Sequence, residues 1–186
     1  MRLLAVALLL VMSSMAAALQ FATSSAGLAL GVKVAHNSSS RSTITFANTV
    51  PLTIRTSAPF VRGLGQKDVR KFTAKIPKKE AKTAIGLSFS DDASHYTRYL
   101  TPDYCSEDKY VSFGGAGFVY PSRSRAARGY AEGDTVGIEC DFSKNTITFS
   151  VNGSAVKEVP FGQDVDLLFP SISCEKGLVV METFLD

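Results

Sequence analysis

The two histidines are the first candidates for acid–base or metal chemistry. His36 precedes a serine-rich run, residues 37–40, which would offer nucleophiles beside a base. No G-x-S-x-G elbow accompanies it, so we expect a solvated loop there. His95 follows Asp91 and Asp92 at a spacing that matches no standard metal-ligand set. The sequence therefore predicts neither a catalytic histidine nor a bound metal.

Paired carboxylates and a glycine-rich stretch suggest two further kinds of chemistry. Glu139 and Asp141 are two residues apart on an expected strand, but a sandwich glycosidase needs such a pair to face a cleft. We expect that face to meet solvent instead. The stretch Gly114–Gly117 lacks the lysine and following helix of a phosphate-binding loop, so a plain turn is expected. The sequence predicts no enzyme, no cofactor and no small-molecule substrate.

The three cysteines are Cys105, Cys140 and Cys174, and they show neither C-x-x-C nor zinc spacing. An odd count argues against a complete disulfide framework. One bridge plus a free thiol stays compatible with an oxidising compartment. Cys140 alternates with apolar neighbours such as Ile138 and Phe142, which is typical of a small core residue.

Period-two alternation of apolar and polar residues predicts the elements that would position any site. The expected strands are residues 43–46, 52–55, 71–76, 85–90, 110–113, 118–120, 135–142, 146–151, 167–173 and 178–184. Asn152-Gly153 is the strongest hairpin-turn signal. Residues 91–109 and 121–129 are expected to be loops. Closely spaced strands without helical periodicity predict an all-β fold, an antiparallel two-sheet β-sandwich.

The N-terminal segment is expected to be a targeting leader. Arg2 precedes an apolar run, Leu3–Met12, and Ala16–Ala18 supplies small residues for cleavage. This order is typical of a secretory signal peptide. The predicted organisation is residues 1–18 as leader, 19–31 as linker and 32–186 as domain. A mitochondrial transit peptide and a retained membrane anchor are the alternatives, and a membrane would be a partner in the second case alone.

Charge is divided unevenly along the chain. Residues 1–90 carry 12 Lys or Arg against 2 Asp or Glu, whereas residues 91–186 carry 8 against 15. A basic face that meets an acidic partner is one interpretation. Because strands from both halves should pair in one sandwich, we expect the charges to mix in space.

Two motifs give this predicted sandwich a family resemblance. Gly133–Gly137 reads G-D-x-x-G, and Phe149–Gly153 reads F-x-x-N-G. With Leu168–Ser173 and Val180–Phe184 following in order, residues 70–184 resemble the SPRY domain family. The resemblance implies a concanavalin A-like sandwich. The tryptophan common early in the family is absent, and the segment Ser94–Asp108 matches nothing in the family.

The resemblance also implies a non-catalytic module that binds a protein or peptide partner through loops at one end of the sandwich. Two loops carry tyrosine and arginine, which interface hot spots favour. The expected partner-binding residues are Tyr96, Arg98, Tyr99 and Tyr104 in the first loop, and Tyr120, Arg123, Arg125 and Arg128 in the second.

The sequence says less about the chemistry of the partner than about the residues expected to bind it. Three arginines within six residues would suit an acidic segment. A nucleic-acid site would want more basic residues interleaved with aromatics, so none is expected. The leader places this function in the secretory pathway or outside the cell. The alternatives are an accessory structural subunit of a mitochondrial or membrane complex, and a lectin-like carbohydrate binder.

Overall fold

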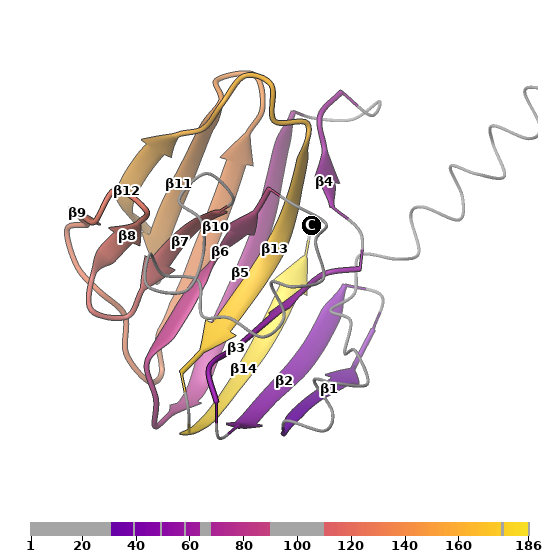
Figure 1. Ribbon diagram of the computed structural model, residues 1–186, viewed down its shortest axis with the longest axis vertical. Coiled ribbons are helices and arrows are strands. Elements are labelled where there is room, and N and C mark those ends of the chain that lie inside the picture. Colours follow the sequence, from indigo (N-terminus) through magenta and orange to yellow (C-terminus); the bar gives the residue numbers. More distant parts are fainter. Residues whose placement is uncertain are drawn as a thin grey trace, which may run out of the picture.

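The computed structural model describes residues 31–38, 40–48, 50–57, 59–63, 68–89, 110–175 and 177–185. Fourteen strands lie within these residues (Figure 1). They are β1 (Val32–His36), β2 (Arg41–Asn48), β3 (Leu52–Arg55), β4 (Phe60–Val61), β5 (Val69–Lys79), β6 (Thr83–Ser88), β7 (Tyr110–Gly114), β8 (Phe118–Tyr120), β9 (Ser124–Arg125), β10 (Thr135–Asp141), β11 (Thr146–Val151), β12 (Ser154–Pro160), β13 (Leu167–Cys174) and β14 (Gly177–Leu185). The leader 1–18 and almost all of the linker 19–31 lie outside the described residues.

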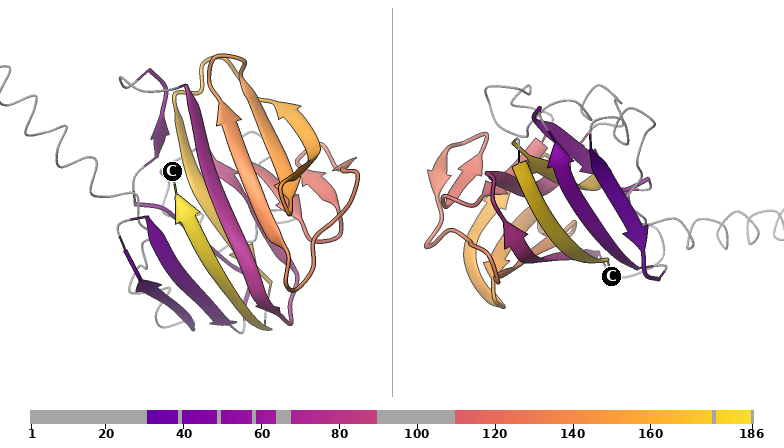
Figure 2. Two further views of the ribbon diagram at one scale, coloured as in Figure 1. Left: turned by 180° about the vertical axis from the view of Figure 1, so that it is seen from behind. Right: turned by 90° about the horizontal axis from the view of Figure 1, so that it is seen from below.

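The strands form two antiparallel sheets stacked face to face (Figure 2). Sheet A has the order β1-β2-β14-β5-β10-β11-β12. Sheet B has the order β3-β13-β6-β7-β8-β9, and β4 pairs with β13 beside it. The predicted all-β, two-sheet sandwich is confirmed.

Alternate residues of each strand fill the space between the sheets. In β5, Phe72, Ala74 and Ile76 are fully buried, while the residues between them are at least partly exposed. They belong to one apolar core with Phe113 of sheet B and Phe149 of sheet A, whose ring centroids lie 5.5 Å apart. Burial of this apolar surface is the main force that holds the two layers together.

The basic and acidic halves of the chain interleave, as expected. In sheet A, β14 lies between β2 and β5, and β10 pairs with β5 on its other side. Ion pairs join the halves directly: Lys71 to Glu139 at 2.8 Å, Arg62 to Asp166 at 3.1 Å and Lys82 to Glu175 at 3.6 Å. The charge asymmetry in sequence therefore does not separate into one basic and one acidic half in space.

Several predictions about individual segments can be compared with the structure. Cys140 is fully buried in β10, as predicted, and it and Cys174 are free thiols. The loop expected at residues 121–129 contains the short strand β9. Edge strands β1 and β12 were missed because their sequences do not alternate cleanly. Asp91, Asp92, His95 and Cys105 lie outside the described residues.

No helix in the described part of the chain is long and apolar enough to cross a bilayer.

Candidate protein-interaction surface

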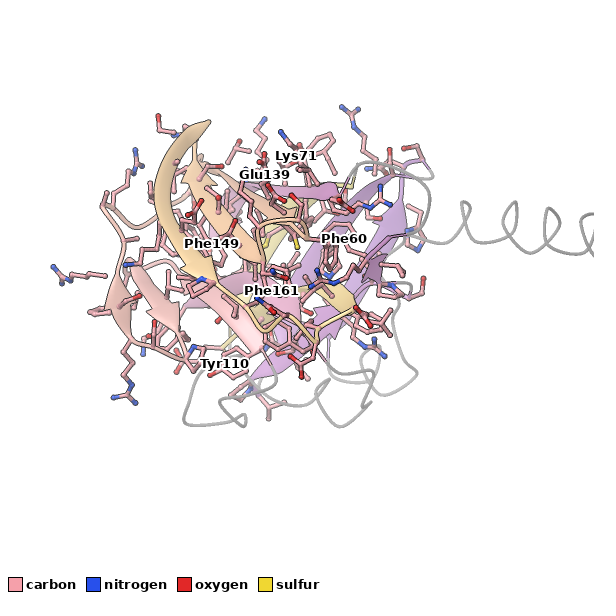
Figure 3. All side chains as sticks on the ribbon, turned by 90° about the horizontal axis from the view of Figure 1, so that it is seen from above. Phe60, Lys71, Tyr110, Glu139, Phe149 and Phe161 are labelled. Carbon is pink, nitrogen blue, oxygen red and sulfur yellow. The ribbon has the colours of Figure 1, made fainter. Side chains whose placement is uncertain are left out.

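The strand registers define two ends of the sandwich. At one, here called the Tyr120 end, Ser88 pairs with Tyr110 and Ser112 pairs with Tyr120. At the other, called the Asp134 end, Asp134 and Asn152 flank the start of β10 and the end of β11. Figure 3 looks at the molecule from above and shows Tyr110 on the side away from Lys71 and Glu139. Tyr110 therefore lies on the sheet B side, and Lys71 and Glu139 lie on the outer face of sheet A.

The first predicted loop cannot be placed. Tyr96, Arg98, Tyr99 and Tyr104 lie outside the described residues, so their role stays a prediction. The described strands that precede and follow this segment, β6 and β7, pair through Ser88 and Tyr110 at the Tyr120 end.

The second predicted loop is a hairpin that joins β8 to β9. Phe118 pairs with Arg125, and Val119 with Ser124. Within the turn, Ser122 Oγ donates to Val119 O over 3.3 Å and accepts from Ser124 N over 3.3 Å. At the base of the turn the half-buried Tyr120 ring packs against the buried Tyr110. These contacts give the hairpin a defined shape on the surface.

The hairpin lies at one lateral edge of the sandwich, next to β12 (Figures 1 and 2). A hydrogen bond from Ala127 N to Val156 O, 3.0 Å long, ties the chain after β9 to this edge strand of sheet A. Edge strands of both sheets therefore meet here.

The three arginines of this segment do not form one cluster. Arg123 is exposed in the turn with a φ of 52°, and Arg125 is exposed on β9 with its guanidinium 5.2 Å from the centroid of the Phe118 ring. Arg128 lies toward the Asp134 end, where its guanidinium forms an ion pair with Asp134 at 2.9 Å. Arg123 and Arg125 are thus on the accessible hairpin, whereas Arg128 is held by the scaffold.

Asp134 organises the Asp134 end. Its Oδ2 accepts from Ala131 N and from the Arg128 guanidinium, and its Oδ1 accepts from Asn152 Nδ2. Asn152 Oδ1 in turn accepts from Thr135 N over 2.8 Å. The Ala131 amide, then the Asn152 amide and the Arg128 charge, hold the pKa of Asp134 below its usual value. This carboxylate is therefore held by three donors of the scaffold.

Lys79 completes the scaffold at this end. Its Nζ donates to Tyr130 O over 3.3 Å and lies 5.0 Å from the Tyr130 ring centroid. Burial lowers the pKa of Lys79, and the Asp134 charge partly opposes this shift. In the predicted turn Gly114–Gly117, Gly117 has a φ of 86°, a conformation that favours glycine.

Arg62 fixes the loops at the Tyr120 end, and the sequence analysis did not identify it. Its guanidinium donates to Phe142 O and Asn145 Oδ1, each over 2.7 Å, and to Val165 O over 3.1 Å. It also forms the ion pair with Asp166. Arg62 therefore connects the β10–β11 turn to the β12–β13 loop. The hydrogen-bond partners are 80 to 103 residues away in sequence, so no local signal could have revealed them.

The residues considered for catalysis are engaged in structural contacts. Glu139 is on the outer face of sheet A in its ion pair with Lys71, whereas Asp141 is buried and accepts from Ser143 N and Oγ and from Lys144 N. The expectation that both carboxylates face solvent is therefore wrong for Asp141. His36 Nδ1 lies 3.0 Å from Ser42 Oγ. Among the described residues, no group of three or more His, Cys, Asp or Glu could hold a metal.

Comparison with known proteins identifies the fold and the family. The family model of the SPRY domain matches residues 69–185, more than half of the chain. The crystal structure of the SPRY domain of human HERC1 is similar with a TM-score of 0.54 at 16% identity, covering 77% of this chain and 86% of that one. A crystal structure described as a human SPRY domain has a TM-score of 0.53 at 18% identity, covering 83% and 96%.

No curated protein sequence matched the chain significantly. The structural likeness confirms the sandwich fold of SPRY domains, and the matched range agrees with the segment in which the two sequence motifs lie. SPRY domains generally act as protein-interaction modules. The chain belongs to the SPRY domain family.

Proposed function

We propose that the chain is a non-catalytic module that binds a protein or peptide partner with the β8–β9 hairpin, in the secretory pathway or outside the cell. Protein binding is the general activity of SPRY domains, and the hairpin supplies a surface for it. The observation that carries the proposal is the accessible hairpin itself, internally hydrogen-bonded and anchored by the packing of Tyr120 on Tyr110. A preorganised surface loses little conformational entropy on binding.

The engagement of candidate catalytic groups supports a non-catalytic role. Glu139 is paired with Lys71, and Asp141 is used by its own turn. Burial raises the pKa of the Cys140 thiol to about 12, which opposes formation of a nucleophilic thiolate.

Site-specific photocrosslinking tests the position of the binding surface. Benzoylphenylalanine is placed at Ala127, beside β9, or at Ala35 on β1; both alanines are exposed, and β1 is at the opposite edge of sheet A from β12. The tagged full-length protein is irradiated in its native cells, and adducts are identified by mass spectrometry. We expect a discrete adduct from position 127 and none from position 35. The same adducts from both positions, or none from either, would contradict the proposed surface.

The compartment is tested by the mature N-terminus of the same purified protein. A start near Leu19 supports secretion. A start between Gly31 and Arg62 would instead support an organelle and the accessory-subunit alternative, and an intact N-terminus would support a retained anchor.

A further inference from the structure

We infer that the partner segment bound by the hairpin is acidic, and that Arg125, stacked on Phe118, is the side chain that recognises its carboxylates. This inference rests on the proposed function, because it names the chemistry of the partner that the same hairpin binds.

Positive charge predominates in the sequence around the hairpin. Residues 110–131 contain three arginines and neither Asp nor Glu. The nearest downstream acidic residues are Glu132, which accepts from Lys79 N, and Asp134, which accepts from three donors, one of them Arg128. These two carboxylates are therefore already committed to other groups. Arg125 presents a positive charge on the exposed hairpin that a carboxylate-bearing segment would complement.

Arg125 is exposed on β9. Its guanidinium lies over the Phe118 ring, and within the described part of the chain no carboxylate forms an ion pair with it. Arg62 and Arg128, in contrast, each form an ion pair. Arg41 also lies over a ring, that of Phe184, but it is on β2, away from the hairpin. Stacking on an aromatic ring leaves the edge of a guanidinium, with its N–H donors, available to a planar carboxylate.

The strand pairing of the hairpin preorganises the Arg125 side chain. Phe118 and Arg125 are cross-strand partners in register, so their stacking follows from the pairing of β8 with β9. Most arginine side chains lose rotamer entropy when they bind a ligand. A guanidinium already restrained by a ring loses less of it, which lowers the cost of holding a carboxylate.

A peptide-binding assay tests the inference. Fluorescein-labelled deca-glutamate and deca-glutamine are titrated with the full-length protein, and anisotropy is measured at low and at physiological salt. We expect binding of deca-glutamate alone, weakened by salt. The double variant Arg123→Glu/Arg125→Glu should bind at least about tenfold more weakly.

The matched control is Lys33→Glu/Lys75→Glu, which changes the net charge equally at exposed lysines of β1 and β5. The affinity of this control for deca-glutamate should stay within about twofold of wild type. A loss of affinity equal to that of Arg123→Glu/Arg125→Glu would show that binding depends only on the net charge of the protein, and would overturn the inference. Arg125→Lys keeps the charge and Phe118→Leu removes the ring; each should weaken binding about threefold or more. Unchanged affinity in both would overturn the role of the stacked guanidinium.

Other anions define the remaining outcomes. Tighter, hairpin-dependent binding of single-stranded DNA or of phosphatidylserine vesicles would overturn the assignment to an acidic protein segment. If the photocrosslink at Ala127 forms but deca-glutamate does not bind, the proposed function stands and the acidic partner is excluded. If deca-glutamate binds through Arg125 but no crosslink forms in cells, the proposed function fails and the chemistry of the hairpin stands.

Discussion

Asn152 donates a hydrogen bond from Nδ2 to Oδ1 of Asp134 over 2.7 Å, and this bond joins two sequence motifs that lie 18 residues apart. Asp134 belongs to the G-D-x-x-G motif, and Asn152 belongs to F-x-x-N-G. The amide oxygen of the same side chain, Asn152 Oδ1, accepts a hydrogen bond from Thr135 N, which ties the turn to the start of β10. The two motifs occur together because each supplies half of one hydrogen-bonded network.

Asn152→Asp should break this network. The substitution places a second carboxylate against Asp134 and removes the donor, while the turn can still be formed because Asp also tolerates a positive φ. We expect a loss of about 1–3 kcal/mol in the free energy of unfolding at pH 7, measured by urea denaturation. The loss should shrink below about pH 4, where one carboxyl takes up a proton. A loss that does not depend on pH would contradict the repulsion between the two carboxylates.

The acid stability of the domain should depend on Asp141. Hydrogen bonds from Lys144 and Ser143 lower the pKa of Asp141 to about 2 in the folded state. Because the folded pKa lies below the unfolded value near 3.9, Asp141 stabilises the fold fully above that value, and its contribution is lost as the pH falls toward about 2.

Asp141→Asn tests this expectation. The urea midpoint of the variant should be lower than that of wild type at pH 6, and the difference should narrow between about pH 4 and pH 2. Ser143→Ala is the control for the turn, since it removes one of the donors to Asp141 and leaves the carboxylate. If the difference in urea midpoint between wild type and Asp141→Asn stays constant from about pH 4 to about pH 2, the negative charge of Asp141 does not stabilise the fold.

Arg62 should be required for the ordered arrangement of loops at the Tyr120 end. Arg62→Ala removes its hydrogen bonds to Phe142, Asn145 and Val165 as well as the ion pair with Asp166, and we expect a loss of about 2–4 kcal/mol in urea denaturation. Hydrogen exchange should increase first in residues 142–146 and 161–166. Arg62→Lys should not restore stability, because one ammonium cannot reach all four partners. Full stability in Arg62→Lys would show that charge alone suffices.

The sequence predicted the parts of the fold that rest on local pattern. Cys140 was recognised as a core residue because its strand alternates strictly, and the turn at Asn152 because Asn-Gly favours positive φ. Strand β12 was missed because only Val156 of its seven residues is buried, so no alternating apolar face marks it in the sequence. The contacts of Arg62 and the stacking of Arg125 on Phe118 were not predicted, because they depend on contacts between segments. The three arginines were grouped because they are close in sequence, but Arg128 is held away from the other two by Asp134.

The two described cysteines should be unreactive in the folded protein. Burial raises the pKa of Cys140 and of Cys174 to about 12 each, with Asp141 and Glu175 respectively adding to the shift. At pH 8 the thiolate fraction of each would be about one part in ten thousand, and neither side chain is open to a reagent.

Alkylation with iodoacetamide at pH 8, followed by peptide mass spectrometry, measures this protection. Labelling of Cys140 and Cys174 should be at least about a hundredfold slower in the native protein than in guanidinium chloride, where both thiols return to an ordinary pKa near 8.5. The unfolded chain is the internal control for reagent and digestion. Native labelling of Cys140 at the unfolded rate would mean that β10 separates from β5 or β11 often enough to expose the core, which the hydrogen-bonded pairing of that strand on both sides argues against.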